Sequence, residues 1–122
     1  MLIIYKKNFE KIAMGLLSFM PAEKKDVKLL QHTMKEYETN SDWHLYLWKE
    51  EDILGAIGLK IVDGEVIIQH ISVNPSHRNM GIGKKMLNEI KRQYEENYTI
   101  SAAELVKNYV EACFNGKKQD AE

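Results

Sequence analysis

One segment of the sequence combines residue types that can bind an anion: Val73-Asn74-Pro75-Ser76-His77-Arg78-Asn79-Met80-Gly81-Ile82-Gly83. A β-branched run precedes Pro75, and apolar residues at helical spacing follow Gly83. The pattern predicts a strand, a proline-marked loop and a glycine-rich helix start. Such a turn points backbone N–H groups and a helix N-terminus at one spot, which binds phosphate or another anion without a charged side chain.

Two familiar phosphate-binding loops have different requirements at fixed positions. A dinucleotide-binding fingerprint needs a third glycine three positions after Gly83, where this sequence has Met86. A P-loop needs a glycine five positions before Gly83 and a hydroxyl residue after the lysine, but those positions hold Arg78 and Lys85. Both loops are therefore excluded. The pattern that remains is Arg-x-x-Gly-x-Gly behind a strand that ends in Val-x-Pro.

This remaining pattern resembles motif A of the GNAT acyltransferases, whose loop cradles the pyrophosphate of acetyl-coenzyme A. The resemblance runs from Met1 to about Phe114. It implies acetyl-coenzyme A as acyl donor and transfer of the acetyl group to an amine. The chain is also similar to the short acetyltransferase-like proteins encoded with bacterial riboflavin-synthesis genes, which implies a link to riboflavin metabolism. A purely structural helix-start turn is the competing interpretation of the loop.

The resemblance assigns the cofactor to nearly continuous residues. Backbone groups of the strand at 71–73 would hydrogen-bond the pantetheine arm, and the amides of 78–84 would hold the pyrophosphate. Arg78 and Lys84 would add positive charge, whereas Lys85 is interpreted as a solvated helix residue. The predicted cofactor-binding residues are Ile71, Ser72, Val73, Arg78, Asn79, Met80, Gly81, Ile82, Gly83 and Lys84.

Acyl transfer to an amine also needs a group that takes a proton from the acceptor. Relatives use a Glu or His on the strand before the loop, or a water held there, and the matching positions here are Ile67 and Gln69. Neither side chain takes a proton at pH 7. We therefore expect Gln69 to orient a water and Glu65, on the same face of the strand, to receive its proton.

His70 is a second candidate base, since histidine titrates near neutrality. Strict strand alternation places it on the same face as Val66 and Ile68, opposite to Gln69. A hydrogen-bonded structural histidine is the competing interpretation there. His32 and His44 have no motif around them and are interpreted as structural.

The general acid implied by the resemblance is Tyr109. In the family a tyrosine on the last helix protonates the coenzyme A thiolate, and a Gly-Phe pair follows it. Tyr109 precedes Phe114 by five positions, the same offset, although Cys113 replaces the glycine. The alternative is that Tyr109 only packs inside its own helix.

The first half of the chain shows strand and helix signals in alternation. A β-prone start precedes Asn8, which is expected to cap a helix that ends before Pro21. Asp26 is expected to cap a second helix. Three strands follow in an antiparallel meander, with Asp63-Gly64 as a two-residue hairpin turn. These strands are predicted at Trp43–Trp48, Ile53–Val62 and Val66–Val73.

After the glycine-rich loop we expect a helix at 82–96 and a short strand at 98–100. Ser101-x-x-Glu104 reads as a capping box that opens a last helix through about Phe114, with Gly116 at its C-terminus. The order β-α-α-β-β-β-α-β-α predicts an α+β sandwich with a mixed, mainly antiparallel sheet flanked by helices, and it matches the first part of the GNAT fold.

Length and composition predict one domain over residues 1–122 with a short polar tail at 115–122, since 44% of 122 residues are apolar. A net charge of −1 argues against a nucleic-acid partner. The lone Cys113 forms no intrachain disulfide, and no run approaches the roughly 18 apolar residues that span a bilayer. We expect a cytoplasmic protein that uses no metal.

The sequence departs from the family after the last helix, where most members continue with two more strands. Only Asn115–Glu122 follow here, so the acceptor site is expected to be open, completed by a second copy in a homodimer, or absent. The acceptor would be a small-molecule or peptide amine. A non-catalytic acetyl-coenzyme A-binding module with a regulatory or scaffolding role is the alternative function.

Overall fold

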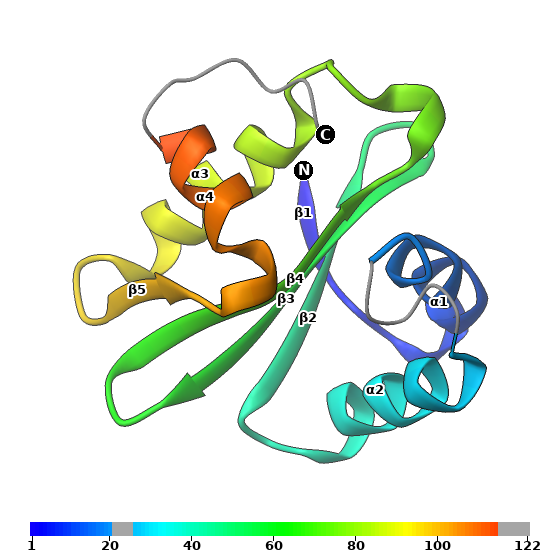
Figure 1. Cartoon of the computed structure of the whole chain (residues 1–122), viewed down its shortest axis with the longest axis horizontal. Helices are drawn as coiled ribbons and strands as arrows, with labels where there is room; N and C mark the ends of the chain where they lie inside the picture. Colours follow the sequence, from blue (N-terminus) through cyan, green and yellow to red (C-terminus); the bar gives the residue numbers. More distant parts are fainter. Residues whose placement is uncertain (21–25, 115–122) are drawn as a thin grey trace.

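A single five-stranded sheet runs through the computed structural model, which describes residues 1–20 and 26–114. The strands lie in the sheet in the order in which they occur along the chain, and all neighbours are antiparallel except the last pair, which is parallel (Figure 1). The expected mixed, mainly antiparallel sheet is confirmed. The strands are β1 (Leu2–Ile4), β2 (Trp43–Lys49), β3 (Ile53–Val62), β4 (Glu65–Val73) and β5 (Thr99–Ala102).

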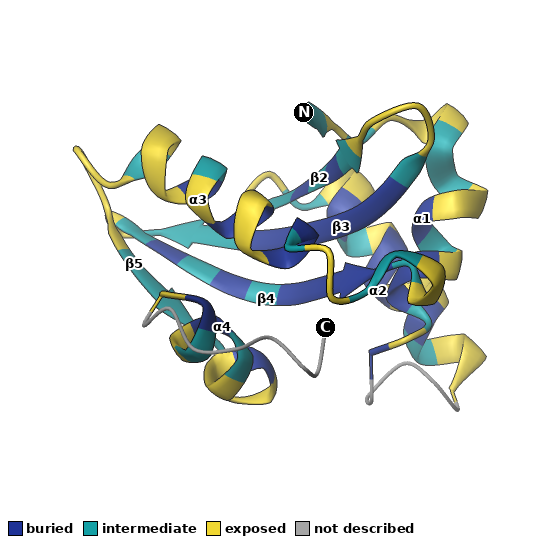
Figure 2. Ribbon diagram, turned by 90° about the horizontal axis from the view of Figure 1, so that it is seen from above, coloured by how far each residue is buried: buried dark blue, intermediate teal, exposed yellow. Residues whose placement is uncertain are grey.

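Helices cover both faces of this sheet, as predicted (Figure 1). Buried side chains of α1 and α2 pack on Leu45, Leu47 and Ala56, whereas those of α3 and α4 pack on the other face. Figure 2 shows the resulting pattern, with buried strands in the middle and exposed outer surfaces on the helices. The helices are α1 (Glu10–Leu17), α2 (Val27–Thr39), α3 (Ile82–Tyr94) and α4 (Lys107–Phe114), with short 3₁₀ turns η1 (Lys7–Phe9), η2 (Pro75–His77) and η3 (Glu104–Val106).

The hairpin between β3 and β4 has the predicted turn. Asp63 and Gly64 have φ angles of 52° and 76°, and Val62 pairs with Glu65 across them. Two successive positive φ angles are typical of the turn whose twist matches that of the flanking strands. The Asp-Gly pair therefore fixes the register of the hairpin at its closed end.

A β-bulge in β4 changes which side chains face which helices. Gly58 pairs with His70 and Leu59 with Ile68, so Gln69 is the extra residue. His70 consequently faces α2, whereas Val66 and Ile68 pack with α3 and α4. The prediction that His70 shares a face with those two residues was wrong, because strict alternation holds only in a strand without a bulge.

The parallel strands β4 and β5 separate just at this bulge. Their pairing ends with Ile68 and Ala102, and the N–H of Ala103 donates the last hydrogen bond to the carbonyl of Ile68 at 2.9 Å. The chain then turns into η3 and α4 (Figure 1). In the part of the chain that the structure describes, no strand therefore pairs with β4 from Gln69 onward on the side of β5; we call this the open side of β4.

Two predicted capping residues have other roles. Asn8 lies inside η1, and the residue before α1 is Phe9, which makes no side-chain capping bond. Ser101 lies in β5, where its hydroxyl donates to Glu65 at 2.9 Å, so it opens no helix. Pairing with β4 outweighs the local capping pattern there, and the last helix starts only at Lys107.

Other helix and strand limits also differ from those predicted from the sequence. The first helix ends at Leu17 instead of just before Pro21, the helix after the loop ends at Tyr94, and the last strand covers 99–102 instead of 98–100. The predicted Asp26 cap is confirmed, since its carboxylate accepts from the N–H of Leu29 at 3.0 Å. The expected C-terminal role of Gly116 lies outside the described residues. None of the described helices has the length and apolar character needed to cross a bilayer.

Candidate functional site

The candidate site begins where β4 ends and the chain turns toward α3. The Asn74 side-chain oxygen accepts from the N–H of Ser76 at 3.0 Å and from its hydroxyl at 2.7 Å. Pro75 starts the short η2 turn that this cap stabilises. The Val-x-Pro pattern thus redirects the backbone out of the sheet immediately after β4.

Two residues in the left-handed region bring the chain into α3. Asn79 has a φ of 65° and Gly81 a φ of 78°. A Cβ at Gly81 would meet nothing within 4 Å, so the backbone angle and not crowding favours glycine there. Asn is among the few other residues that tolerate this region. The glycine-rich pattern is explained by backbone geometry at its first glycine.

The first turn of α3 presents its amides toward the loop. The first intrahelical hydrogen bond runs from the N–H of Lys85 to the carbonyl of Gly81 at 3.0 Å, so the amides of residues 82–84 precede it. The dipole of a 13-residue helix adds partial positive charge at the same end. The buried side chain of Ile82 anchors the turn to the core. This arrangement suits a phosphate group.

Tyr109 of α4 lies against this same turn. A Cβ built on Gly83 would come within 1.6 Å of the Tyr109 hydroxyl oxygen, so only a glycine leaves room for that side chain. The second glycine of the loop is therefore explained by close approach. The structure brings together the predicted anion loop and the predicted general acid, which are 26 positions apart in sequence (109 − 83).

The charged side chains of the loop differ in their surroundings. The Arg78 Nε donates to the carbonyl of Val73 at 3.3 Å, and its guanidinium carbon lies 5.6 Å from the centre of the Phe19 ring. Lys84 is exposed. Lys85 lies 4.0 Å from the Glu50 carboxylate, a weak surface pair that agrees with its interpretation as a solvated residue.

The predicted pantetheine strand is paired on one side and open on the other. Residues Ile71, Ser72 and Val73 pair with β3, but β5 has already left the sheet at this height. The Ser72 hydroxyl donates to the carbonyl of Leu16 at 2.6 Å, so this side chain points toward α1. Backbone groups are thus what this segment offers to a ligand.

The candidate bases are distributed over two places. Gln69 is half-buried at the bulge, and its Nε2 donates to the Tyr37 hydroxyl over a long 3.4 Å. The Tyr37 hydroxyl and the Nδ1 of His70 are 2.5 Å apart. Glu65 lies at the other end of β4 and accepts from Ser101. Gln69 lies four positions after Glu65 along the extended strand, roughly 13 Å away.

Tyr37 of α2 was not among the candidate residues predicted from the sequence. A signal existed in Gly58, an interior glycine of the predicted strand. A Cβ there would come within 1.9 Å of the Tyr37 hydroxyl oxygen. An interior strand glycine often marks a bulge or a close approach, and here it marks both.

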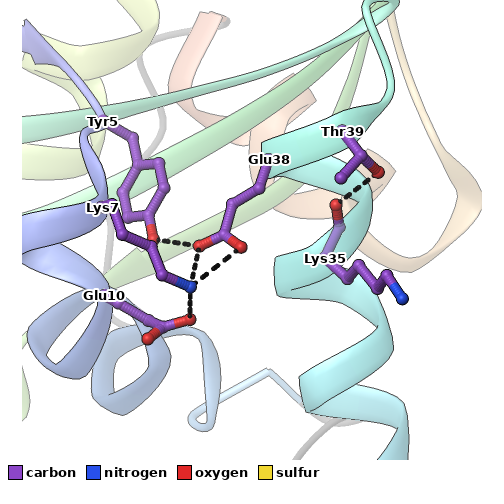
Figure 3. A network of polar contacts seen from close by, with 6 residues as sticks. All are labelled: Tyr5, Lys7, Glu10, Lys35, Glu38 and Thr39. Carbon is purple, nitrogen blue, oxygen red and sulfur yellow. Dashed lines mark hydrogen bonds and ion pairs between the residues drawn. The ribbon is translucent and has the colours of Figure 1, made fainter.

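A polar network fixes the two helices on the α1 and α2 face (Figure 3). Glu38 of α2 accepts from the Tyr5 hydroxyl at 2.7 Å and from the Lys7 ammonium at 3.2 Å, and Lys7 also donates to Glu10 at 2.7 Å. These hydrogen bonds, that from Tyr5 above all, hold the pKa of the Glu38 carboxyl below its usual range. Burial and the neighbouring Glu38 raise the pKa of the Tyr5 phenol. No group of three metal-binding side chains occurs within residues 1–20 and 26–114.

The comparison with known proteins agrees with this geometry. Residues 11–115 match the model of the Acetyltransferase (GNAT) family. The chain belongs to the GNAT acetyltransferase family. It is 58% identical over 116 residues to a protein of Bacillus methanolicus described as "Uncharacterized N-acetyltransferase in lysA 3'region", with 93% of this chain and 91% of that protein covered.

Solved structures share the GNAT fold with this chain. An aminoglycoside 6′-N-acetyltransferase from Acinetobacter haemolyticus superimposes with a TM-score of 0.71 at 11% identity, covering 100% of this chain and 90% of the other. Another, in complex with a bisubstrate analogue that contains coenzyme A, also has a TM-score of 0.71, at 14% identity with 95% and 86% covered. A probable acetyltransferase reaches 0.76 at 10% identity, covering 100% of this chain and 91% of that one.

Proposed function

We propose that this GNAT protein transfers an acetyl group from acetyl-coenzyme A to an amine by direct attack of the amine on the thioester. The observation that supports this most is the placement of Tyr109 against Gly83, at the N-terminus of α3. An anion-binding turn, an open strand and a proton donor then lie in one region of a family member. A covalent acyl-enzyme is not part of the proposal.

The donor would lie across three parts of the site. The pyrophosphate takes the amides of 78–84, with Arg78 and Lys84 supplying charge. The pantetheine arm hydrogen-bonds the backbone of Ile71, Ser72 and Val73 and so occupies the gap that β5 leaves. The thioester then points toward the bulge at Gln69. These assignments follow from the family resemblance, and they agree with the end of the β4–β5 pairing at Ile68 and Ala102.

The chemical step needs one proton removed and one supplied. As the amine nitrogen bonds to the carbonyl carbon, the carbon–sulfur bond breaks, and Tyr109 gives its phenolic proton to the departing thiolate. Gln69 orients the attacking group or its water. Glu65, the proton acceptor expected from the sequence, lies roughly 13 Å along the strand from Gln69, so it could reach the amine proton only through intervening water.

The acceptor in this proposal is a small-molecule or peptide amine, in a cytoplasmic setting. A role beside riboflavin synthesis and a homodimer that completes the acceptor side are further parts of the proposal, and they rest on resemblance alone. No residue in the sequence indicates a flavin or pterin site.

Binding of the donor is tested by thermal unfolding. Acetyl-coenzyme A should raise the melting temperature, because a ligand that binds only the folded state stabilises it. Gly81→Glu should abolish this rise, since it places a carboxylate in the anion-binding turn, and Gly83→Glu should do so because its side chain must also displace Tyr109 from that turn. Gly15→Glu is the matched control, because Gly15 is an exposed helical glycine with nothing within 4 Å of its Cβ position. An unchanged wild-type melting curve at saturating acetyl-coenzyme A would refute the proposal.

Catalysis is tested separately by thiol release from acetyl-coenzyme A with a panel of small amines and peptides. An acetyltransferase releases free thiol with at least one of them, and Tyr109→Phe slows the release. A binding module raises its melting temperature with acetyl-coenzyme A but releases no thiol with any amine. That second result would favour a regulatory or scaffolding role.

A further inference from the structure

We infer that the amine proton is taken by a relay of two side chains, Tyr37 of α2 and His70 of β4. The inference deepens the proposed acetyl transfer and rests on it. In this relay Tyr37 is the catalytic residue that contacts the amine, and His70 is the group that takes the proton from Tyr37. Neither Glu65 nor a distant water chain is then required.

The pair contacts Gln69, the residue at which β4 and β5 separate and toward which the proposed function directs the thioester. Gln69 and His70 both turn toward α2 because of the bulge, and both contact the Tyr37 hydroxyl, at 3.4 and 2.5 Å. Gln69 is also the first residue of β4 beyond the pairing with β5. The Tyr37 hydroxyl therefore contacts the residue at which the gap proposed for the donor begins.

Several elements are shaped around this hydroxyl. Gly58 of β3 leaves the space that it occupies, because a Cβ there would be 1.9 Å away. The Tyr37 ring contacts Trp43 edge-on at 5.0 Å and His70 edge-on at 5.5 Å between ring centres. A strand glycine and a bulge are both unfavourable for a regular sheet, and bulges recur beside active sites, where they re-aim side chains.

The hydrogen bonds define the direction of proton movement. His70 is 8% exposed, and its Nδ1 accepts from the Tyr37 hydroxyl when the imidazole is the neutral Nε2–H tautomer. In the relay the phenol oxygen takes up the amine proton as it gives its own proton to His70. Gln69 donates to the same oxygen and fixes its orientation.

The step balances as a double transfer. As the amine nitrogen bonds to the thioester carbon, its proton passes to the Tyr37 oxygen while the Tyr37 proton passes to Nδ1 of His70. The products are an amide, neutral Tyr37 and a His70 imidazolium. Tyr109 protonates the thiolate, and the imidazolium and the Tyr109 phenolate return to their starting states by exchange with solvent.

Two variants separate this role from a structural one. Tyr37→Phe keeps the ring contacts and removes the oxygen, whereas His70→Asn keeps an acceptor for the Tyr37 hydroxyl but is not a base. Both should lower kcat for thiol release by about 10²-fold or more, with the KM for acetyl-coenzyme A changed by about twofold at most. Tyr46→Phe is the control, since it removes the hydroxyl pair with Tyr94, 2.7 Å apart, on the other face of the sheet. A His70→Asn variant with wild-type kcat would overturn the relay.

A measurement without turnover addresses the same point. In protein labelled with ¹⁵N-histidine, the ring nitrogens of His70 are assigned by their loss in His70→Asn. At pH 8 we expect Nδ1 without a proton and Nε2 with one. An Nδ1–H tautomer or an imidazolium would refute the relay even if the wild type releases thiol. Wild-type protein that releases no thiol with any amine refutes acetyl transfer, and the relay with it, whatever the tautomer.

Discussion

At the scale of single residues, two glycines leave space for the two tyrosine hydroxyls to which the proposals assign proton transfer. Gly58 lies under the hydroxyl of Tyr37, and Gly83 under that of Tyr109. Glycine in the interior of a strand or helix costs roughly 0.5–1 kcal/mol relative to alanine. Glycine is nevertheless present at positions 58 and 83, because a methyl group there would displace a tyrosine hydroxyl. The two contacts thus link backbone composition directly to the proposed chemistry.

The contact between Gly83 and Tyr109 can be tested by stability. Gly83→Ala should destabilise the fold by about 1–3 kcal/mol, because the new methyl group must displace Tyr109. Adding Tyr109→Phe should recover part of this loss, since the nearest clashing atom is removed. Chemical denaturation measures both effects.

Gly15→Ala is the control for the helix propensity of alanine. Its Cβ position is open, so this variant should gain up to about 1 kcal/mol. A Gly83→Ala protein as stable as the wild type would show that Tyr109 does not pack on the loop.

At the scale of elements, features with local causes were predicted from the sequence and features with non-local causes were not. Asp26 caps α2 and Asp63-Gly64 forms the hairpin, because both depend on neighbours within three residues. The bulge at Gln69 depends on contacts with β3 and α2. Ser101 has a local capping pattern but lies in β5, because it pairs with β4 instead of starting a helix. The same reason explains the site: the loop was predicted, but Tyr37 was not.

The hairpin offers a test at this scale. Gly64→Ala should cost roughly 1–2 kcal/mol, because a side chain is strained at a φ of 76° although nothing lies within 4 Å of the Cβ position. Asp63→Asn should leave stability nearly unchanged, since asparagine tolerates its φ of 52°. Urea unfolding of the two variants compares them directly. Equal stability of Gly64→Ala and wild type would contradict a left-handed turn in solution.

At the scale of the whole molecule, the network around Glu38 ties η1 and the chain after β1 to α1 and α2 and so positions the α2 face that carries Tyr37 (Figure 3). The network should make stability depend on pH at both ends of the range. The pKa of Glu38 is lowered in the folded state, so its contribution is complete above the ordinary value of 4.5 and is lost as the pH falls below it. The pKa of Tyr5 is raised, so its contribution is present below the ordinary value of 10.0 and declines as the pH rises above it.

Two substitutions separate these contributions. Glu38→Gln removes the acidic group, so its stability should fall less steeply than that of the wild type below pH 4.5, from a lower value at pH 7. Tyr5→Phe should flatten the decline above pH 10 and leave Lys7 and Glu10 paired. The free energy of unfolding, measured by denaturant titration from pH 3 to pH 11, gives both slopes. Slopes unchanged in both variants would show that the network does not hold in solution, and the placement of α2 would then depend on its apolar contacts with β2 and β3.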